Sequence, residues 1–494
     1  MNKYLRHGLK FSVLMVLITG TSYSWANSLP VMLNEDQLIQ WAEEENFNQL
    51  RISLGELAKK QERAMYDENF GFKLDAQANY QETKEKSFAQ FIPVTSPLAD
   101  FQMKLSKNSK YGLSYGVMVN SNQYSNNFVK DGTTSSAGAF LALDIYKDFL
   151  GSTSRAQDAS LMVQEEIAKR QRTISSHAFV QEVRKLYWKI VANNESTKIA
   201  KALLKTTKEL QKDTRKRYRS NIADKGDLSR ISSQVEARNG QLYLLEFERN
   251  ELLKTLKSLF PQKLGGKTVQ LAAYNLDRTV DDVMGCTQTI AQHSSSLPLE
   301  YTEYDEVLGL LQKDLELSQK VNNNYDKSDL KLTTQFEVVG KEYSYSNSFQ
   351  ELTDNGDNRF SVGIQWTMPI GGEKDKTREI QDQIIKRQNL AQAQEVKGKL
   401  DAFHAQTLRS VLTLQNVIRA QKRNEVHLRD TLKDSKRKFK QARVTSQDLL
   451  IDENQLLNSN LDEISTKYQV IETIINYFTV FNQTPCKLNR RAKL

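Results

Sequence analysis

The 494-residue chain has few of the residues that mark several protein classes. Its two cysteines are too few for a disulfide framework or a multi-cysteine metal site. No run of 18 or more apolar residues occurs, which excludes a membrane-spanning helix. The chain holds only 7 proline and 21 glycine residues. Because both residue types interrupt helices, their scarcity favours long helices.

The formal net charge of +9 is modest for this length, and both signs are interspersed. Three of the positive charges lie in residues 1–26, which contain no acidic residue. A second basic cluster lies in the C-terminal tail, residues 486–494, which we predict to be a solvated end. No basic stripe with interleaved aromatic residues occurs, so we expect no nucleic-acid partner.

The N-terminus has the pattern of a secretory signal peptide. Basic residues precede an apolar run at residues 11–18, and Ser24 and Ala26 place small side chains at the −3 and −1 positions of a cleavage site. The apolar run would span only about 12 Å as a helix, which is too short for a membrane anchor. We therefore predict that residues 1–26 are removed and that the mature chain is exported.

Export would allow the two cysteines to form a disulfide, because exported proteins fold in an oxidising compartment. Cys286 and Cys486 each follow a long helical segment, so they hold comparable positions in the two halves of the chain. A disulfide between them and a pair of free buried thiols are both compatible with the sequence.

Two stretches of the chain are predicted to be very long helices. Neither glycine nor proline occurs between Gly151 and Gly226, or within residues 399–484. Along residues 457–478, apolar residues recur at steps of 3 and 4, which is the spacing of a coiled-coil seam. A helix of about 60 residues would be about 90 Å long. We expect such helices to lie side by side in a rod.

The chain also resembles itself at an offset of 221 residues. The basic segment at residues 216–219 aligns with residues 437–440, and in both copies an Asp-Leu pair follows a polar break. Each copy is predicted to form a helical hairpin, with tips at residues 221–226 and 442–447. The predicted organisation is a first repeat at residues 27–300, a second repeat at residues 301–485, and the tail.

Several segments alternate apolar and polar residues, as strands with two different faces do. Polar stretches at residues 120–138 and 341–358 are predicted to be exposed loops. Strands of about nine residues can cross a bilayer when tilted, but these are too few for one chain to close a barrel. A barrel would therefore require several chains. The predicted strands are residues 72–80, 111–119, 139–145, 332–338 and 360–368.

Two predicted strand-to-helix junctions, one ending at Gly151 and the other at Gly372, resemble those of the TolC-like outer-membrane efflux protein family. The second junction, Met368-Pro369-Ile370-Gly371-Gly372, is similar to the family's Pro-Leu-Phe-Gly-Gly segment. The first junction ends at Gly151 and has Tyr146 and Lys147 where proline is expected. The hairpin tips resemble a second family signature, an aromatic residue followed by glycine and then aspartate. Its positions are Tyr218, Asn221 and Asp227 in the first tip and Phe439, Ala442 and Asp448 in the second, with Asn221 and Ala442 in place of glycine.

The resemblance implies a mainly α fold with membrane β-strands. Three identical chains, with four strands each, would form a 12-stranded β-barrel in the outer membrane, continued by an α-helical barrel across the periplasm. Such a homotrimer is the channel of a tripartite efflux pump or a type I secretion system. Its partners are a periplasmic adaptor, an inner-membrane transporter and outer-membrane lipid. Catalytic residues, cofactors and metals are not implied. The predicted strand at residues 111–119 would be a fifth strand in each chain. It could lie in the barrel or outside it, and the sequence is compatible with both.

The resemblance also assigns conduction and gating to the tips. Asp448 corresponds to an acidic ring in the pore, and Asp452 lies beside the position of a second ring. A cap on its own helix is an equal alternative for Asp448. Asp227 corresponds to one partner of a gate lock, whose tyrosine and arginine are replaced by Phe439 and Val444. The predicted adaptor-contacting residues are Tyr218, Asn221, Phe439 and Ala442.

Signs of other functions are weak. Residues 112–116 fit the Gly-x-Ser-x-Gly pattern of hydrolases, but that serine must lie between a strand and a helix, and here the alternation continues. The five histidines lack metal-binding spacing. The main alternative to a channel is an exported coiled-coil rod, a structural scaffold of the cell envelope. A rod has no use for amphipathic strands, which favours the channel.

Overall fold

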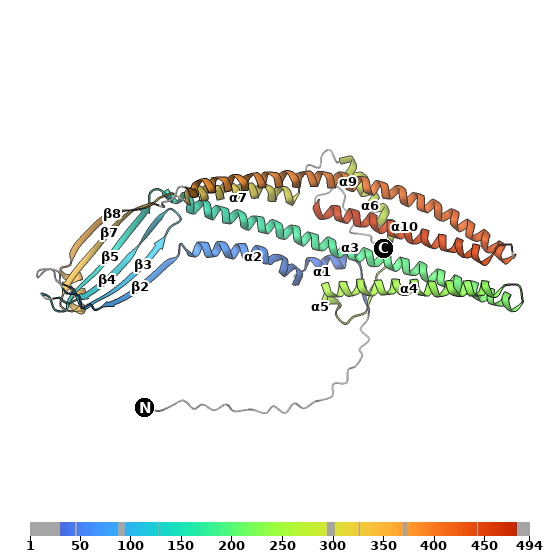
Figure 1. Ribbon diagram of the computed structural model, residues 1–494, viewed down its shortest axis with the longest axis horizontal. Helices are drawn as coiled ribbons and strands as arrows, with labels where there is room; N and C mark the ends of the chain where they lie inside the picture. Colours follow the sequence, from blue (N-terminus) through green and yellow to red (C-terminus); the bar gives the residue numbers. More distant parts are fainter. Residues whose placement is uncertain are drawn as a thin grey trace, which may run out of the picture.

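The computed structural model describes residues 30–44, 47–86, 94–126, 128–293, 302–325, 327–368, 373–441 and 443–481. The predicted signal peptide and the basic tail lie outside these residues. The described part forms a long rod, with a curved sheet at one end and the tips of two helical hairpins at the other (Figure 1).

The elements of the first half run from the middle of the rod to the sheet, back to the tips and back to the middle (Figure 1). They are β1 (Val31–Leu33), α1 (Glu35–Glu43), α2 (Phe47–Glu68), β2 (Phe72–Gln81), β3 (Leu98–Asn108), β4 (Leu113–Tyr124), β5 (Gly132–Asp144), the short helix η1 (Phe149–Gly151), α3 (Ser152–Arg219), α4 (Lys225–Leu259), α5 (Pro261–Leu264), β6 (Val269–Leu271) and α6 (Leu276–His293).

The second half follows the same course with fewer elements. They are α7 (Glu303–Tyr325), β7 (Asp329–Glu342), α8 (Tyr345–Asp354), β8 (Asp357–Thr367), α9 (Glu373–Lys440) and α10 (Ser446–Val480).

The two hairpins repeat at the offset expected from the sequence. Helices α3 and α9 have 68 residues each, and α4 and α10 have 35 each. Each helix of the second hairpin begins 221 residues after its counterpart, which confirms the predicted repeat. A helix of 68 residues is about 100 Å long. The tips are one or two residues earlier than predicted, because α4 already begins at Lys225 and α10 at Ser446.

The sheet has six antiparallel strands in the order β2-β3-β4-β5-β7-β8. The expectation of four strands per chain is therefore wrong for this chain, and β3 was not predicted. The segment at residues 120–138, predicted to be a loop, mostly extends β4 and β5. Within residues 341–358, the predicted loop instead contains α8, which packs on β5 and β7.

The two faces of the sheet differ in polarity across all six strands. Residues paired across neighbouring strands lie on one face, and Leu74, Leu105, Val117, Ala139 and Phe336 form one such row. Large apolar side chains of this face are exposed, with Leu74 at 60% and Phe336 at 48%. The other face is mostly polar. A contiguous exposed apolar face of this size is typical of an interaction surface.

The main hydrophobic core lies in the middle of the rod. Here β1 pairs in parallel with β6, and α1 and α6 pack against the long helices α3 and α10. Trp188 of α3 and Tyr477 of α10 are among its buried aromatic residues. Lys467 adds ion pairs to Asp277 and Glu463, both at 2.7 Å. The segment after α4 thus thickens the rod at its middle.

Cys286 lies in this core, is 5% exposed and is disulfide-bonded. Cys486 lies outside the described residues. The pairing of these two cysteines stays a prediction.

Candidate functional site

Both hairpin tips lie together at the end of the rod far from the sheet (Figure 1). Each tip is closed by the same backbone bond, Ile222 N to Arg217 O at 2.8 Å in the first and Arg443 N to Lys438 O at 3.0 Å in the second. In each bond the N–H group reaches the carbonyl oxygen five residues earlier. This is the pattern of a helix end that is closed by a residue in the left-handed conformation. Asn221 has that conformation, with φ of 56°. Asparagine adopts it more easily than most residues, which explains how Asn221 replaces the expected glycine.

An arginine joins the two tips. Arg217 Nη1 donates to the backbone oxygen of Phe439 at 2.9 Å, and its guanidinium lies 4.5 Å from the centre of the Phe439 ring. Phe439 is only 8% exposed and packs with Leu432 and Leu449. The aromatic residue of the second tip is therefore a packing residue, whereas Tyr218 of the first tip is 40% exposed. Ala442 lies outside the described residues.

A second contact between the tips involves the predicted lock residue Asp227. Its Oδ1 accepts a hydrogen bond of 2.7 Å from Ser446 Oγ, across 219 residues of sequence. Arg230 lies 3.7 Å from the same carboxylate and reaches Gln447 Oε1 at 3.5 Å. Asp227 thus joins the hairpins, but through the Ser446 hydroxyl, which was not predicted, rather than through Phe439 or Val444.

The two acidic residues proposed for the pore have structural partners. Asp448 forms a capping box with Thr445: its Oδ2 accepts from the Thr445 backbone N–H at 3.2 Å, and Thr445 Oγ1 accepts from the Asp448 backbone N–H at 3.2 Å. The Thr445 hydroxyl also donates to the same Oδ2 at 2.6 Å. Asp452 Oδ2 accepts from Ser435 Oγ at 2.5 Å and so joins α10 to α9. Capping explains the geometry of Asp448, and its side chain remains exposed at the tip.

Behind the tips, a buried polar cluster continues the contact between the hairpins. Arg238 of α4 is 7% exposed and donates to Asn454 of α10, which also bonds to Gln234 at 2.9 Å. Burial lowers the pKa of Arg238, and the nearby Glu453 carboxylate opposes that shift. Glu453 is 1% exposed and pairs with Lys436 at 3.2 Å. These buried polar contacts fix the register of the two hairpins, because an unpaired member of the cluster would cost free energy.

The junction between sheet and helices is tight at Gly151. This residue has φ of 72°, and a Cβ placed on it would lie 1.8 Å from the backbone oxygen of Lys110 in the turn between β3 and β4. Lys110 itself bonds to Asp67 of α2 at 2.6 Å and to Asp158 of α3 at 3.0 Å. The second junction residues Pro369, Gly371 and Gly372 lie outside the described residues.

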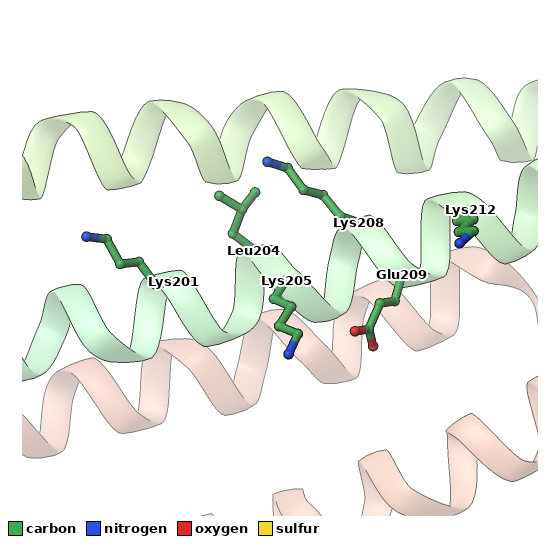
Figure 2. A pocket seen from close by; sticks show the side chains of 6 residues that line it. All are labelled: Lys201, Leu204, Lys205, Lys208, Glu209 and Lys212. Atoms are coloured by element: carbon green, nitrogen blue, oxygen red, sulfur yellow. The ribbon is translucent and has the colours of Figure 1, made fainter.

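A shallow open hollow lies along α3, between the core and the tips. Its residues come from this one helix, with Lys208 pointing toward α4 and Lys205 toward the second hairpin (Figure 2). Side chains of one solvated helix face do not form an enclosed binding site. The hollow is lined by Lys201, Leu204, Lys205, Lys208, Glu209 and Lys212.

Two further features are absent from the described ranges. No group of three or more His, Cys, Asp or Glu side chains there could hold a metal ion. None of the helices in those ranges combines the length and apolarity needed to cross a membrane.

No family model and no curated protein matches the chain. Solved structures do share its fold. CusC is 13% identical with a TM-score of 0.67, covering 92% of this chain and 95% of that chain. The Campylobacter jejuni outer membrane channel CmeC is 12% identical with a TM-score of 0.66, covering 98% and 96%. The Vibrio cholerae outer membrane protein VceC is 12% identical with a TM-score of 0.64, covering 90% and 95%. These likenesses establish the fold over nearly the whole chain and confirm the predicted fold class.

Proposed function

We propose that this chain is an outer-membrane channel, the exit duct of a tripartite efflux pump or a type I secretion system. One observation carries the proposal: a sheet with one exposed apolar face is joined to two hairpins of long helices. The solved structures that share this fold include proteins described as outer membrane channels. The apolar face of such a sheet can contact lipid while its polar face contacts water. The helices would continue the duct through the periplasm.

Closure of the duct requires further copies of the chain. The edge strands β2 and β8 are fully exposed along their length, and an open sheet edge is not tolerated in a bilayer. They run in opposite directions, so β8 of one copy can pair antiparallel with β2 of the next. The helices beside these edges also carry exposed apolar residues, Leu50, Leu54 and Leu57 on α2 and Ile380 and Ile384 on α9. We propose a ring of three copies, the assembly that the family resemblance implies.

The hairpin tips would form the periplasmic entrance. Tyr218 and Asn221 are exposed there and available to a periplasmic adaptor protein, which would connect the duct to an inner-membrane transporter. The contacts of Arg217 and Asp227 would hold the two hairpins of each chain together and keep the entrance narrow. Such a duct acts by conduction and needs no catalytic residue or cofactor of its own.

Fractionation of cell envelopes separates this proposal from the exported scaffold. The chain should band with outer-membrane markers in a density gradient and resist extraction by alkaline carbonate. A scaffold would instead appear among the water-soluble or peripheral proteins, and that result would contradict the channel.

Asp448→Asn tests the acidic ring at the entrance. If three Asp448 carboxylates face the lumen, removing their charge should weaken block by a multivalent cation about tenfold or more in planar-bilayer recordings. The amide can still accept the bonds of the capping box, so helix α10 should keep its start.

Thr445→Ala is the matched control for the capping role of Asp448. It removes the hydroxyl that caps α10, which costs about 1 kcal/mol of stability, and leaves the carboxylate in place. Cation block should therefore stay as in the unsubstituted channel. Equal block in all three proteins would place Asp448 outside the pore.

A further inference from the structure

We infer that the membrane barrel of this protein contains eighteen strands, six from each of three chains, and not twelve. The inference rests on the proposed function, since it presupposes a three-chain barrel. It concerns the hairpin β3–β4, which the structure inserts between β2 and β5. Without this hairpin each chain would supply four strands, the number that the family resemblance implies.

The hairpin is a full member of the sheet. Pairing of β3 with β2 runs from Phe72↔Lys107 to Gln81↔Leu98, along all of β2. On its other side, β4 pairs with β5 from Leu113↔Leu143 to Tyr124↔Gly132. Strands β2 and β5 are not paired with each other, so only the hairpin connects β2 to the rest of the sheet.

The hairpin also carries the same two faces as the strands beside it. Met103 pairs with Val119 and Leu105 with Val117, on the apolar face that includes Leu74 of β2. Met103 is 40% exposed and Val117 is 53% exposed. The apolar face therefore continues across β3 and β4 without a gap. A hairpin lying in water would leave this apolar surface exposed at a free-energy cost.

The opposite face of the hairpin suits an aqueous lumen. Gln102 pairs with Asn120 on this face, and Ser106 with Gly116. In β-barrels that span the outer membrane, apolar residues face lipid and polar residues face the interior, in alternation along each strand. The hairpin follows this rule along β3 and in the middle of β4, whereas Ser121 and Gln123 continue the apolar face of β4 with polar side chains and the buried Met118 lies on the opposite face.

The turn of the hairpin is built into the junction with the helices. Lys110 lies between α2 and α3, through its ion pairs with Asp67 and Asp158. Asp144 N donates to Gly112 O at 2.9 Å, which joins the turn to the end of β5. The hairpin thus reaches the same level as the base of the other strands.

A wider exit follows from the added strands. Barrel diameter grows roughly linearly with strand number, so eighteen strands give a barrel about 1.5 times as wide as twelve. The lumen is lined by polar side chains such as Gln102 and Asn120 and would be filled with water. Selection of cargo would then lie at the hairpin tips, and the barrel would pass bulky hydrated cargo such as a polypeptide.

Spin labels at paired positions test where the hairpin lies. Met103→Cys and Val119→Cys would place a label on the apolar face of β3 and β4, and Gln102→Cys and Asn120→Cys on the polar face. Leu74→Cys on β2 is the reference for a lipid-facing strand. The protein is labelled without a reducing agent, so that the disulfide-bonded Cys286 does not react, and is then reconstituted in phosphatidylcholine vesicles. The unsubstituted chain, treated in the same way, measures any labelling that does not depend on the introduced cysteine.

Labels at 103 and 119 should collide several-fold more with lipid-dissolved oxygen than with an aqueous nickel complex, as the label at 74 should. Labels at 102 and 120 should show the reverse. Water-like behaviour at 103 and 119 with lipid-like behaviour at 74 would overturn the inference and leave the channel standing. Water-like behaviour at all five positions would overturn both. Electron cryo-microscopy gives an independent count, since a cross-section of the barrel should show eighteen strands, and twelve would contradict the inference.

Discussion

Gly151→Ala should strongly reduce the yield of folded, assembled protein. An alanine Cβ at this position would lie 1.8 Å from the backbone oxygen of Lys110, so the turn between β3 and β4 would have to move. The positive φ of 72° adds about 1–2 kcal/mol for any residue with a Cβ. Together, we expect destabilisation of at least about 3 kcal/mol. The readout is the urea concentration at which the assembled protein unfolds, with the yield of detergent-stable oligomer.

Gly266→Ala is the matched control for this substitution. Gly266 has nearly the same backbone angle, with φ of 69°, but a Cβ there would meet nothing within 4 Å. Its replacement should cost only about 1–2 kcal/mol, which is the conformational part of the effect. Equal losses in the two variants would show that the close approach to the β3–β4 turn contributes nothing.

Breaking the contacts between the tips should open the channel. The double variant Arg217→Met with Asp227→Ala removes the bond to the Phe439 backbone and the bond from Ser446. Hydrogen bonds to charged groups contribute about 1.5–3 kcal/mol each, so the closed arrangement should lose about 3 kcal/mol or more per chain. Each 1.4 kcal/mol changes an equilibrium tenfold. Single-channel conductance in planar bilayers should therefore rise several-fold.

The control for the gate removes one arginine and one aspartate from α3 alone. Arg219→Met with Asp213→Ala changes two exposed residues of α3, neither of which bonds to the second hairpin within the described structure. The net charge of the tip changes equally, so conductance should stay low. A rise of the same size in the control would attribute the effect to charge, and no rise in either variant would show that these contacts do not hold the gate.

The hairpins were predictable because their signal is local. Long stretches without glycine or proline and a regular apolar spacing fix the helices, and the 221-residue repeat fixes their pairing. Even the length of each helix is matched between the two halves, because the repeat includes the residues that end it.

The sheet was predicted less completely, because a strand need not alternate apolar and polar residues along its whole length. In β5, residues 132–136 are Gly, Thr, Thr, Ser and Ser, so both faces are small and polar and no two-residue period is visible. In β3, the alternation of Ala99, Phe101 and Met103 directly follows Pro97. Its place in the sheet depends on pairing with strands on both sides, which sequence alone does not give.

At the tips, the sequence identified the acidic residues but not their partners. Asp227 was singled out by the family resemblance, whereas Ser446 lies 219 residues further along and meets it only when the two hairpins pack together. Asp448 was assigned two roles, and its capping box with Thr445 was readable as the pattern of a helix start.

The most direct test of the account is the native mass of the protein after extraction from the outer membrane in mild detergent. Three mature chains per particle would support a barrel closed by neighbouring β8 and β2 strands. A monomer or dimer that is soluble without detergent would contradict it. In that case the amphipathic sheet would need another partner, and the exported scaffold would be the better interpretation.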